Sequence, residues 1–164
     1  FGEVIIDGEN ILNLKNNEIA KMRNEKIGFV FQFHHLLSEF TALENVLMPV
    51  WIGRSKSGKK EEATDLFAEL NLCSKMNYYP NQLSGGERSR VALIRGIINK
   101  PKILLADEPT GNLDEKNAIV LIELLKKINT DFNQSIIITT HNPDVAKLGY
   151  SRYDLANGVL KTMR

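Results

Sequence analysis

The sequence predicts an α/β domain with a mostly parallel sheet, and three short, mainly apolar runs are the basis of that prediction. The runs are residues 27–31, 103–106 and 136–140. Each run is continuous rather than alternating, which is typical of parallel strands that are buried on both faces. Polar side chains follow each run, namely Gln32, then Asp107 with Glu108, then His141. Because ligands bind beyond the carboxyl ends of such strands, we expect the functional site at that edge of the sheet.

Length and composition restrict the class of protein further. A chain of 164 residues has room for one compact domain. Its 21 Lys and Arg against 20 Asp and Glu give a formal net charge of +1, which argues against a polybasic nucleic-acid surface. With 43% hydrophobic and 25% charged residues, wholesale disorder is excluded. No apolar run approaches the roughly 18 residues of a membrane span, and the single Cys73 excludes an intramolecular disulfide.

The first element of the chain is a predicted strand without any lead-in. Residues 3–8 have the composition of a strand, and the first residue is Phe1 rather than Met. Neither a charged region nor an apolar region of a signal peptide precedes them. We therefore expect the chain to start inside a domain whose beginning is missing.

Helices are predicted between the strands. Residues 41–79 contain no strong strand, so they form a predicted helical insertion, with an exposed loop at residues 54–60. Two segments repeat the i, i+3, i+4, i+7 spacing of an amphipathic helix, at Ala63, Leu66, Phe67 and Leu70 and at Leu121, Leu124, Leu125 and Ile128. Near the end of the chain, Asn157-Gly158 predicts a type I′ hairpin.

Ser84 and Glu87 indicate where another helix begins. They stand three positions apart, as the N-cap and N3 residues of a capping box do. A cap does not explain the intervening Gly85 and Gly86, since each glycine costs about 1 kcal/mol relative to alanine within a helix. Glycines allow a ligand to approach the backbone amides, and a helix N-terminus attracts anions. The cap and a phosphate contact are compatible interpretations.

Two adjacent acidic residues, Asp107 and Glu108, follow the second apolar run. A buried strand that ends on an aspartate is typical of sites that hold Mg²⁺ near nucleotide phosphates. The glutamate beside it is a candidate general base for polarising an attacking water. The alternative is that both carboxylates cap the next helix, but adjacent acids directly after a buried strand are uncommon in a purely structural role. His141 or Gln32 taken alone would be much weaker evidence for a functional site than these two carboxylates.

Taken together, five ordered motifs resemble those of ABC-transporter ATPases. They are the Q-loop at Gln32, the signature at residues 83–87, the Walker B pair Asp107 and Glu108, the D-loop at residues 111–114, and the H-loop at His141. The match covers essentially the whole chain. Residues 33–37 and 40–46 are most similar to the lipoprotein-releasing (LolD) type. Glu87, where most ABC ATPases carry Gln, and residues 106–114 are similar both to that type and to the macrolide-export (MacB) type.

This resemblance implies a P-loop NTPase-like (RecA-like) fold, with an inserted helical subdomain in a mostly parallel α/β sheet. Residues 1–33 and 89–164 would form a partial nucleotide-binding core, and residues 34–88 the helical signature subdomain. Both would belong to one ABC ATPase domain.

The resemblance also implies a head-to-tail homodimer that holds two ATP molecules and Mg²⁺ at its interface. The implied catalytic residues are Glu108 to activate water, His141 to contact the γ-phosphate, and Gln32. Asp107 and Gln32 would approach the metal. The nucleotide held by the opposite subunit would be bound by Ser84, Gly85, Gly86 and Glu87, and Asp114 would couple the two sites.

The implied partner is a transmembrane permease, one helix of which would enter a groove formed by residues 33–48. Closure on ATP would then drive lipoprotein release, which implies a peripheral location on the cytoplasmic face of the inner membrane and no nucleic-acid partner. Macrolide export and cell division remain alternatives. A DNA-repair ATPase would have a long coiled coil between Gln32 and Ser84, and no sustained heptads occur there.

Two family features are missing from the sequence. The phosphate-binding Walker A loop and the aromatic residue that stacks on adenine both lie upstream of a strand like residues 4–8, and nothing precedes Phe1. Residues 53–60 fit G-x-x-x-x-G-K, but Lys60 replaces the Ser or Thr that would bind Mg²⁺, and the segment lies in the helical insertion. We therefore expect ATP hydrolysis by the full-length protein and little or no ATP affinity in the 164-residue chain alone, so a non-hydrolysing truncated fragment is a further alternative.

Adjacent His34 and His35 lack a third ligand, and no metal site is predicted there.

Overall fold

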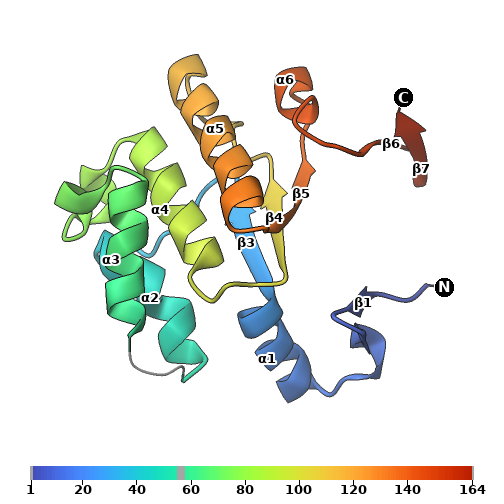
Figure 1. The fold of residues 1–164 in the computed structure, drawn as a ribbon, viewed down its shortest axis with the longest axis horizontal. Coiled ribbons are helices and arrows are strands. Elements are labelled where there is room, and N and C mark those ends of the chain that lie inside the picture. Colours follow the sequence, from blue (N-terminus) through green and yellow to red (C-terminus); the bar gives the residue numbers. More distant parts are fainter. Residues whose placement is uncertain (1, 55–57, 164) are drawn as a thin grey trace.

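The central sheet has three parallel strands in the order β3-β4-β5. A computed structural model describes residues 2–54 and 58–163 (Figure 1). The strands are β3 (Ile27–Phe31), β4 (Ile103–Asp107) and β5 (Ser135–Thr139). They coincide within one residue with the three predicted runs, which confirms the parallel sheet.

The two faces of this sheet differ in burial. Val30 and Leu104 are buried on the face against which α4 (Gly85–Ile97) packs, and α5 (Glu115–Asp131) packs on α4 within the same core. On the opposite face Phe29, Phe31 and Ile137 keep 37%, 36% and 54% of their surface exposed. The prediction that the strands are buried on both faces is therefore wrong for the described residues, because their apolar core lies on one side of the sheet.

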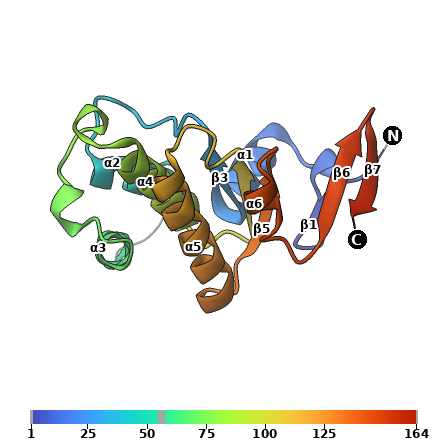
Figure 2. The ribbon, with the colours of Figure 1, turned by 90° about the horizontal axis from the view of Figure 1, so that it is seen from above.

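The predicted helical insertion is confirmed. It contains α2 (Ala42–Ile52), α3 (Lys59–Glu69) and short 3₁₀ turns at Cys73–Lys75 and Pro80–Gln82. The stripe on α3 is fully buried, namely Ala63, Leu66, Phe67 and Leu70. Figure 2 shows α2, α3 and α4 grouped on one side of the strands. Residues 55–57 of the predicted loop lie outside the described residues, and Lys60 belongs to the first turn of α3.

Helix α4 joins the helical insertion to the sheet. It packs on α2 and on β3, and two glycines allow the close approach to the strand. A Cβ atom on Gly28 would lie 2.1 Å from the backbone oxygen of Gly96, so only glycine fits there. The predicted boundary between residues 88 and 89 falls inside this continuous helix, and the division into core and helical subdomain stays a prediction.

Two small antiparallel hairpins lie at the other end of the molecule from the helical insertion (Figure 2). The first pairs β1 (Ile5–Ile6) with β2 (Glu9–Asn10), and the second pairs β6 (Arg152–Ala156) with β7 (Val159–Met163). Asn157 and Gly158 have φ angles of 52° and 75°, which confirms the predicted type I′ turn. The predicted strand at residues 3–8 is shorter than expected, because Asp7 and Gly8 form a turn with positive φ.

The remaining elements connect these parts. A 3₁₀ turn at Ile11–Asn13 and helix α1 (Asn16–Lys26) lead from the first hairpin into β3, and α6 (Pro143–Ala146) follows β5. Phe1 lies outside the described residues. Among the helices in the described part of the chain, none is long and apolar enough to cross a membrane.

Candidate active site

The register of the parallel sheet brings the predicted site residues to one edge. Phe31, Asp107 and Thr139 are direct neighbours across the three strands. Gln32 and Glu108 follow these positions directly and His141 follows by two residues, while Asp107 is the last residue of β4, so all four predicted residues lie at the carboxyl ends of the strands. This is where parallel α/β sheets bind their ligands.

Glu108 is held in place from three directions. Its Oε1 accepts a hydrogen bond from the backbone N–H of His141 at 2.8 Å and lies 2.5 Å from the His141 ring Nδ1. Its Oε2 accepts a hydrogen bond from the Thr140 hydroxyl at 3.2 Å, and that hydroxyl accepts one from the Asn142 backbone N–H at 3.0 Å. Glu108 also has a positive φ of 43°, which places its backbone in the left-handed region. The carboxylate is thus oriented by the H-loop.

The His141 ring has one nitrogen bound and one exposed. An ionised carboxylate can accept hydrogen bonds but cannot donate them. The proton between the two groups is therefore carried by His141 Nδ1. The side chain is 85% exposed, whereas that of Glu108 is 19% exposed. The pair therefore presents the imidazole Nε2 to the outside and keeps the carboxylate in a sheltered position.

Asp107 and Gln32 each have an oxygen atom free for a ligand. The Thr139 hydroxyl donates to Asp107 Oδ1 at 2.5 Å, and Oδ2 accepts no hydrogen bond from the described residues. Gln32 Nε2 donates to Asn112 Oδ1 at 3.4 Å, while Asn112 Nδ2 donates to the Gln32 backbone oxygen at 3.1 Å. Gln32 Oε1 likewise accepts nothing from the described part of the chain. Carboxylate and amide oxygens are suitable ligands for Mg²⁺.

The signature segment forms the predicted capping box at the start of α4. The Ser84 hydroxyl accepts from the Glu87 N–H at 3.3 Å, and the Ser84 N–H donates to Glu87 Oε2 at 2.7 Å. Lys75 Nζ lies 3.3 Å from Glu87 Oε1. The Ser84 backbone hydrogen bond, followed by the Ser84 hydroxyl and the Lys75 ammonium, lowers the pKa of Glu87 below its ordinary value. Glu87 is therefore ionised and favourably placed at the positive end of the helix.

The two signature glycines have different surroundings. A Cβ on Gly85 would meet only Leu113 Cδ2 at 3.8 Å, which is an ordinary contact. A Cβ on Gly86 would lie 2.0 Å from Asn117 Oδ1 on α5. A side chain at residue 86 would therefore require the Asn117 side chain to move, whereas no described neighbour obstructs one at residue 85. Asp114 begins α5, its Oδ1 accepting from the Asn117 N–H at 2.8 Å.

The turn after Gln32 is tied to α4. His34 is buried, and its Nε2 lies 2.7 Å from the Ser89 hydroxyl, which donates to the Gly85 backbone oxygen at 3.1 Å. The Arg95 guanidinium donates to the backbone oxygens of His34 and His35 at 2.5 and 2.7 Å. Both histidines have positive φ, and these hydrogen bonds hold that unfavourable conformation. The His34 ring therefore has a structural partner in α4.

We expect His34 to make the protein less stable in mild acid. Burial, and then the charges of Arg88 and Arg95, lower the pKa of His34 below its ordinary value of 6.5. As the pH falls through 6.5, the unfolded chain binds a proton there and the folded protein does not, so the free energy of unfolding decreases. Denaturant unfolding between about pH 7 and pH 5.5 measures this slope.

The matched variants are His34→Gln and His35→Gln. The first removes the buried ring and should flatten the decrease. The second removes an exposed ring whose charge contributes least to lowering the pKa of His34, and should leave most of the decrease in place. A wild-type slope in His34→Gln would contradict this assignment.

Sequence reasoning missed several residues that hold the predicted ones in place. Thr139 and Thr140 hold the two carboxylates, Asn112 and Asn117 bind Gln32 and Asp114, and Arg95 with Ser89 anchors the turn after Gln32. Two threonines immediately before His141 were a usable signal, because hydroxyls at a strand end reach the neighbouring strand end. The contacts of Asn112 with Gln32 and of Arg95 with the turn connect positions far apart in sequence, and no local pattern indicates them. Asn117, by contrast, lies only three residues after the N-cap Asp114, so that spacing was also a usable signal.

Comparison with known proteins adds a family to this geometry. The sequence pattern of the family described as "ABC transporter" matches residues 1–111. The lipoprotein-releasing system ATP-binding protein LolD of Buchnera aphidicola is 45% identical over 147 residues, covering 89% of this chain and 64% of that protein. LolD 2 of Chlorobaculum tepidum is 48% identical over 151 residues, covering 88% and 61%. This chain therefore spans less than two thirds of the length of these two relatives.

Solved structures agree with the fold. The dimeric structure of MJ0796, a bacterial ABC transporter cassette, aligns with a TM-score of 0.86 and 38% identity, covering all of this chain and 74% of that one. A second dimeric structure of the same cassette, in a post-hydrolysis state bound to ADP and Pi, aligns with a TM-score of 0.83 and 37% identity over the same shares.

Proposed function

Because this chain belongs to the ABC transporter family, we propose that it is part of the ATP-binding and ATP-hydrolysing subunit of a transporter that releases lipoproteins from the inner membrane. The observation that supports hydrolysis most strongly is the Glu108 carboxylate, held by His141 and Thr140 beside Asp107 at the end of β4. The cargo is inferred from relatives whose names specify a lipoprotein-releasing system.

In the proposed reaction Glu108 is the general base. Hydrogen bonds at both of its oxygens fix the plane of the carboxylate, so that a lone pair is directed toward a water beyond the strand end. The carboxylate accepts the proton that this water loses as its oxygen bonds to the γ-phosphorus, while the bond from that phosphorus to the bridging oxygen breaks and ADP leaves with the electron pair. His141, whose Nδ1–H is directed at Glu108, offers Nε2 to the phosphate or to its bridging water.

Asp107 and Gln32 are the proposed metal-binding residues. Each has an oxygen that is not engaged by the described residues, and a carboxylate with an amide oxygen suits Mg²⁺. When bound, the metal would neutralise negative charge on the phosphates. Thr139 orients the Asp107 carboxylate, and Asn112 orients the Gln32 amide, so both ligands are preorganised by hydrogen bonds.

The signature residues are proposed to act on a second copy of the protein. Among the described residues, no hydrogen bond or ion pair joins the segment of Ser84, Gly85, Gly86 and Glu87 to Glu108 or His141. The start of α4 has the positive end of a helix dipole and an unobstructed Gly85, which suits a phosphate approaching from outside. In a head-to-tail homodimer these residues, with Asp114, would complete the ATP site of the opposite subunit.

Residues 33–48 are the proposed contact with the transmembrane permease. Phe33 and Leu37 are 69% and 42% exposed, so this segment offers apolar side chains to a partner helix. The Arg95 hydrogen bonds to the His34 and His35 carbonyls link the segment to α4. Movement of α4 during dimer closure would thus be transmitted to a permease on the cytoplasmic face of the inner membrane.

The test is reconstitution of the full-length protein with its permease in vesicles that carry a labelled lipoprotein. ATP with Mg²⁺ should release the lipoprotein to a soluble acceptor, and ATP with EDTA should not. Hydrolysis that is stimulated by a macrolide rather than by lipoprotein would identify the export alternative instead. If the protein does not hydrolyse ATP under any of these conditions, the proposal is wrong.

A further inference from the structure

We propose that Asn117 is a positioning residue that locks the Asp114 carboxylate of the D-loop to the first turn of the signature helix α4. The inference rests on the proposed function, because it concerns how two of its motifs stay aligned within one subunit. It assigns a role to a side chain on α5 that belongs to neither motif.

Asn117 engages both oxygens of Asp114. Its backbone N–H donates to Oδ1 at 2.8 Å, and its side-chain Nδ2 donates to Oδ2 at 2.6 Å. These two hydrogen bonds are the main cause that lowers the pKa of Asp114 below its ordinary value. The carboxylate is therefore ionised, with its orientation set by a single neighbouring residue.

The same hydrogen bonds determine which way the Asn117 amide faces. An ionised carboxylate only accepts, so the NH₂ group must face Asp114 and Oδ1 must face away from it. Oδ1 lies over Gly86, where an added Cβ would be 2.0 Å from Oδ1 and 2.5 Å from Cγ. Asn117 thus fills the space that a side chain at residue 86 would need.

These contacts connect α4 to α5 at the point where the two motifs meet. Helices α4 and α5 pack against each other, and Gly86 is buried. A displacement of the Gly86 backbone toward α5 would push the Asn117 side chain, and with it the Asp114 carboxylate. At Gly85 no such contact exists, because the nearest side-chain atom is an ordinary 3.8 Å away. The position of Asp114 therefore depends on the position of Gly86.

The functional test uses the Asn117→Ala variant of the full-length protein. We expect kcat for ATP hydrolysis to fall about tenfold, the equivalent of one lost charge-assisted hydrogen bond, with KM for ATP within about twofold of wild type. Asn117→Asp keeps the shape but faces Asp114 with a second carboxylate, so we expect at least the same decrease in kcat. Asn117→Gln, which retains the amide, should recover part of the rate.

Asn129→Ala is the matched control. Asn129 lies on the same helix, and its side-chain amide donates to the Gln134 backbone oxygen at 2.8 Å, far from the signature. This variant loses a hydrogen bond of α5 as well, so its midpoint of thermal unfolding should fall while kcat stays at the wild-type value. An equal decrease of kcat in both variants would mean that Asn117 acts only through helix stability, and would overturn the inference.

A double-mutant cycle tests the contact without requiring ATP. Gly86→Ala should lower the free energy of unfolding in the wild-type background and have much less effect in the Asn117→Ala background, where the obstructing atoms are gone. Additive effects would overturn the inference. The cycle measures stability and does not depend on ATP hydrolysis. The proposed function is tested separately, by whether the wild-type protein hydrolyses ATP, so the two can fail independently.

Discussion

Replacing Glu108 by Gln in the full-length protein should reduce the rate of ATP hydrolysis by about 10³-fold while ATP binding is retained. Glutamine has the shape of glutamate and keeps a carbonyl oxygen for the hydrogen bonds from His141 or Thr140. It lacks the basicity needed to accept a proton from water, so chemistry stops and binding does not. Phosphate release and equilibrium ATP binding, measured on the same preparation, report the two effects separately.

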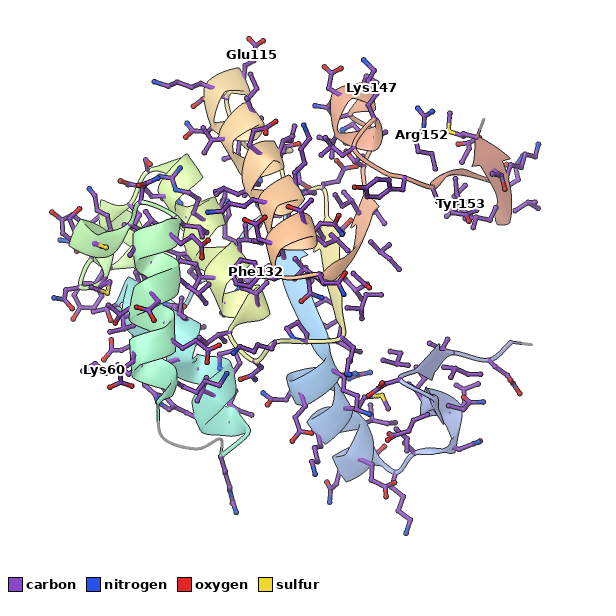
Figure 3. The ribbon with its side chains drawn as sticks, viewed as in Figure 1. Lys60, Glu115, Phe132, Lys147, Arg152 and Tyr153 are labelled. Atoms are coloured by element: carbon purple, nitrogen blue, oxygen red, sulfur yellow. The ribbon has the colours of Figure 1, made fainter. Side chains whose placement is uncertain are left out.

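Glu115→Gln is the matched control for this experiment. Glu115 is another carboxylate, at the first turn of α5, and its side chain extends outward from the helix (Figure 3). The same chemical change there should leave hydrolysis close to wild type. Unchanged turnover in Glu108→Gln would eliminate Glu108 as the base.

Gly85→Asp should abolish ATP-driven dimerisation while the subunit remains folded. A Cβ at residue 85 makes only an ordinary contact with Leu113, and an aspartate in the first turn of α4 interacts favourably with the helix dipole. Its negative charge would repel the phosphates of the ATP molecule held by the other copy. The same substitution at Gly86 is a poorer probe, because any side chain there collides with Asn117.

Gly85→Asn separates charge from size in this test. It matches aspartate in volume, so it should retain much more of the ATP-driven dimer. Light scattering in the Glu108→Gln background, with and without ATP, gives the molar mass for each variant. If Gly85→Asp dimerises as fully as wild type, the signature does not contact nucleotide in the proposed way.

The strand ends were predictable because parallel strands concentrate their chemistry at one edge. Gln32, Glu108 and His141 each follow an apolar run, and the register of the sheet then brings them together. The capping box of Ser84 and Glu87 was predictable for a related reason, since both partners lie within one turn of the same helix. Local patterns of this kind can be predicted from the sequence because they need no distant partner.

Other features depend on contacts that no local pattern contains. The burial of the sheet on one face depends on which elements pack against it. The sequence of a strand such as Ser135–Thr139 is compatible with burial on one face or on both. The reason for Gly86 is the Asn117 side chain, which comes from a different helix. Helix α1 has little apolar periodicity and only Met22 buried, so its sequence contained no stripe to predict it.

The most direct test of the account mixes two inactive variants, Glu108→Gln and Gly85→Asp. In a head-to-tail dimer the base and the signature of each site come from different subunits, so a mixed dimer has one site with both substitutions and one site with neither. Where mixed dimers make up half of all dimers, ATP hydrolysis should return to about a quarter of the wild-type rate, because one of the two sites in each mixed dimer is intact. If each site is complete within one subunit, every subunit in the mixture is defective, and the rate will stay at that of the separate variants.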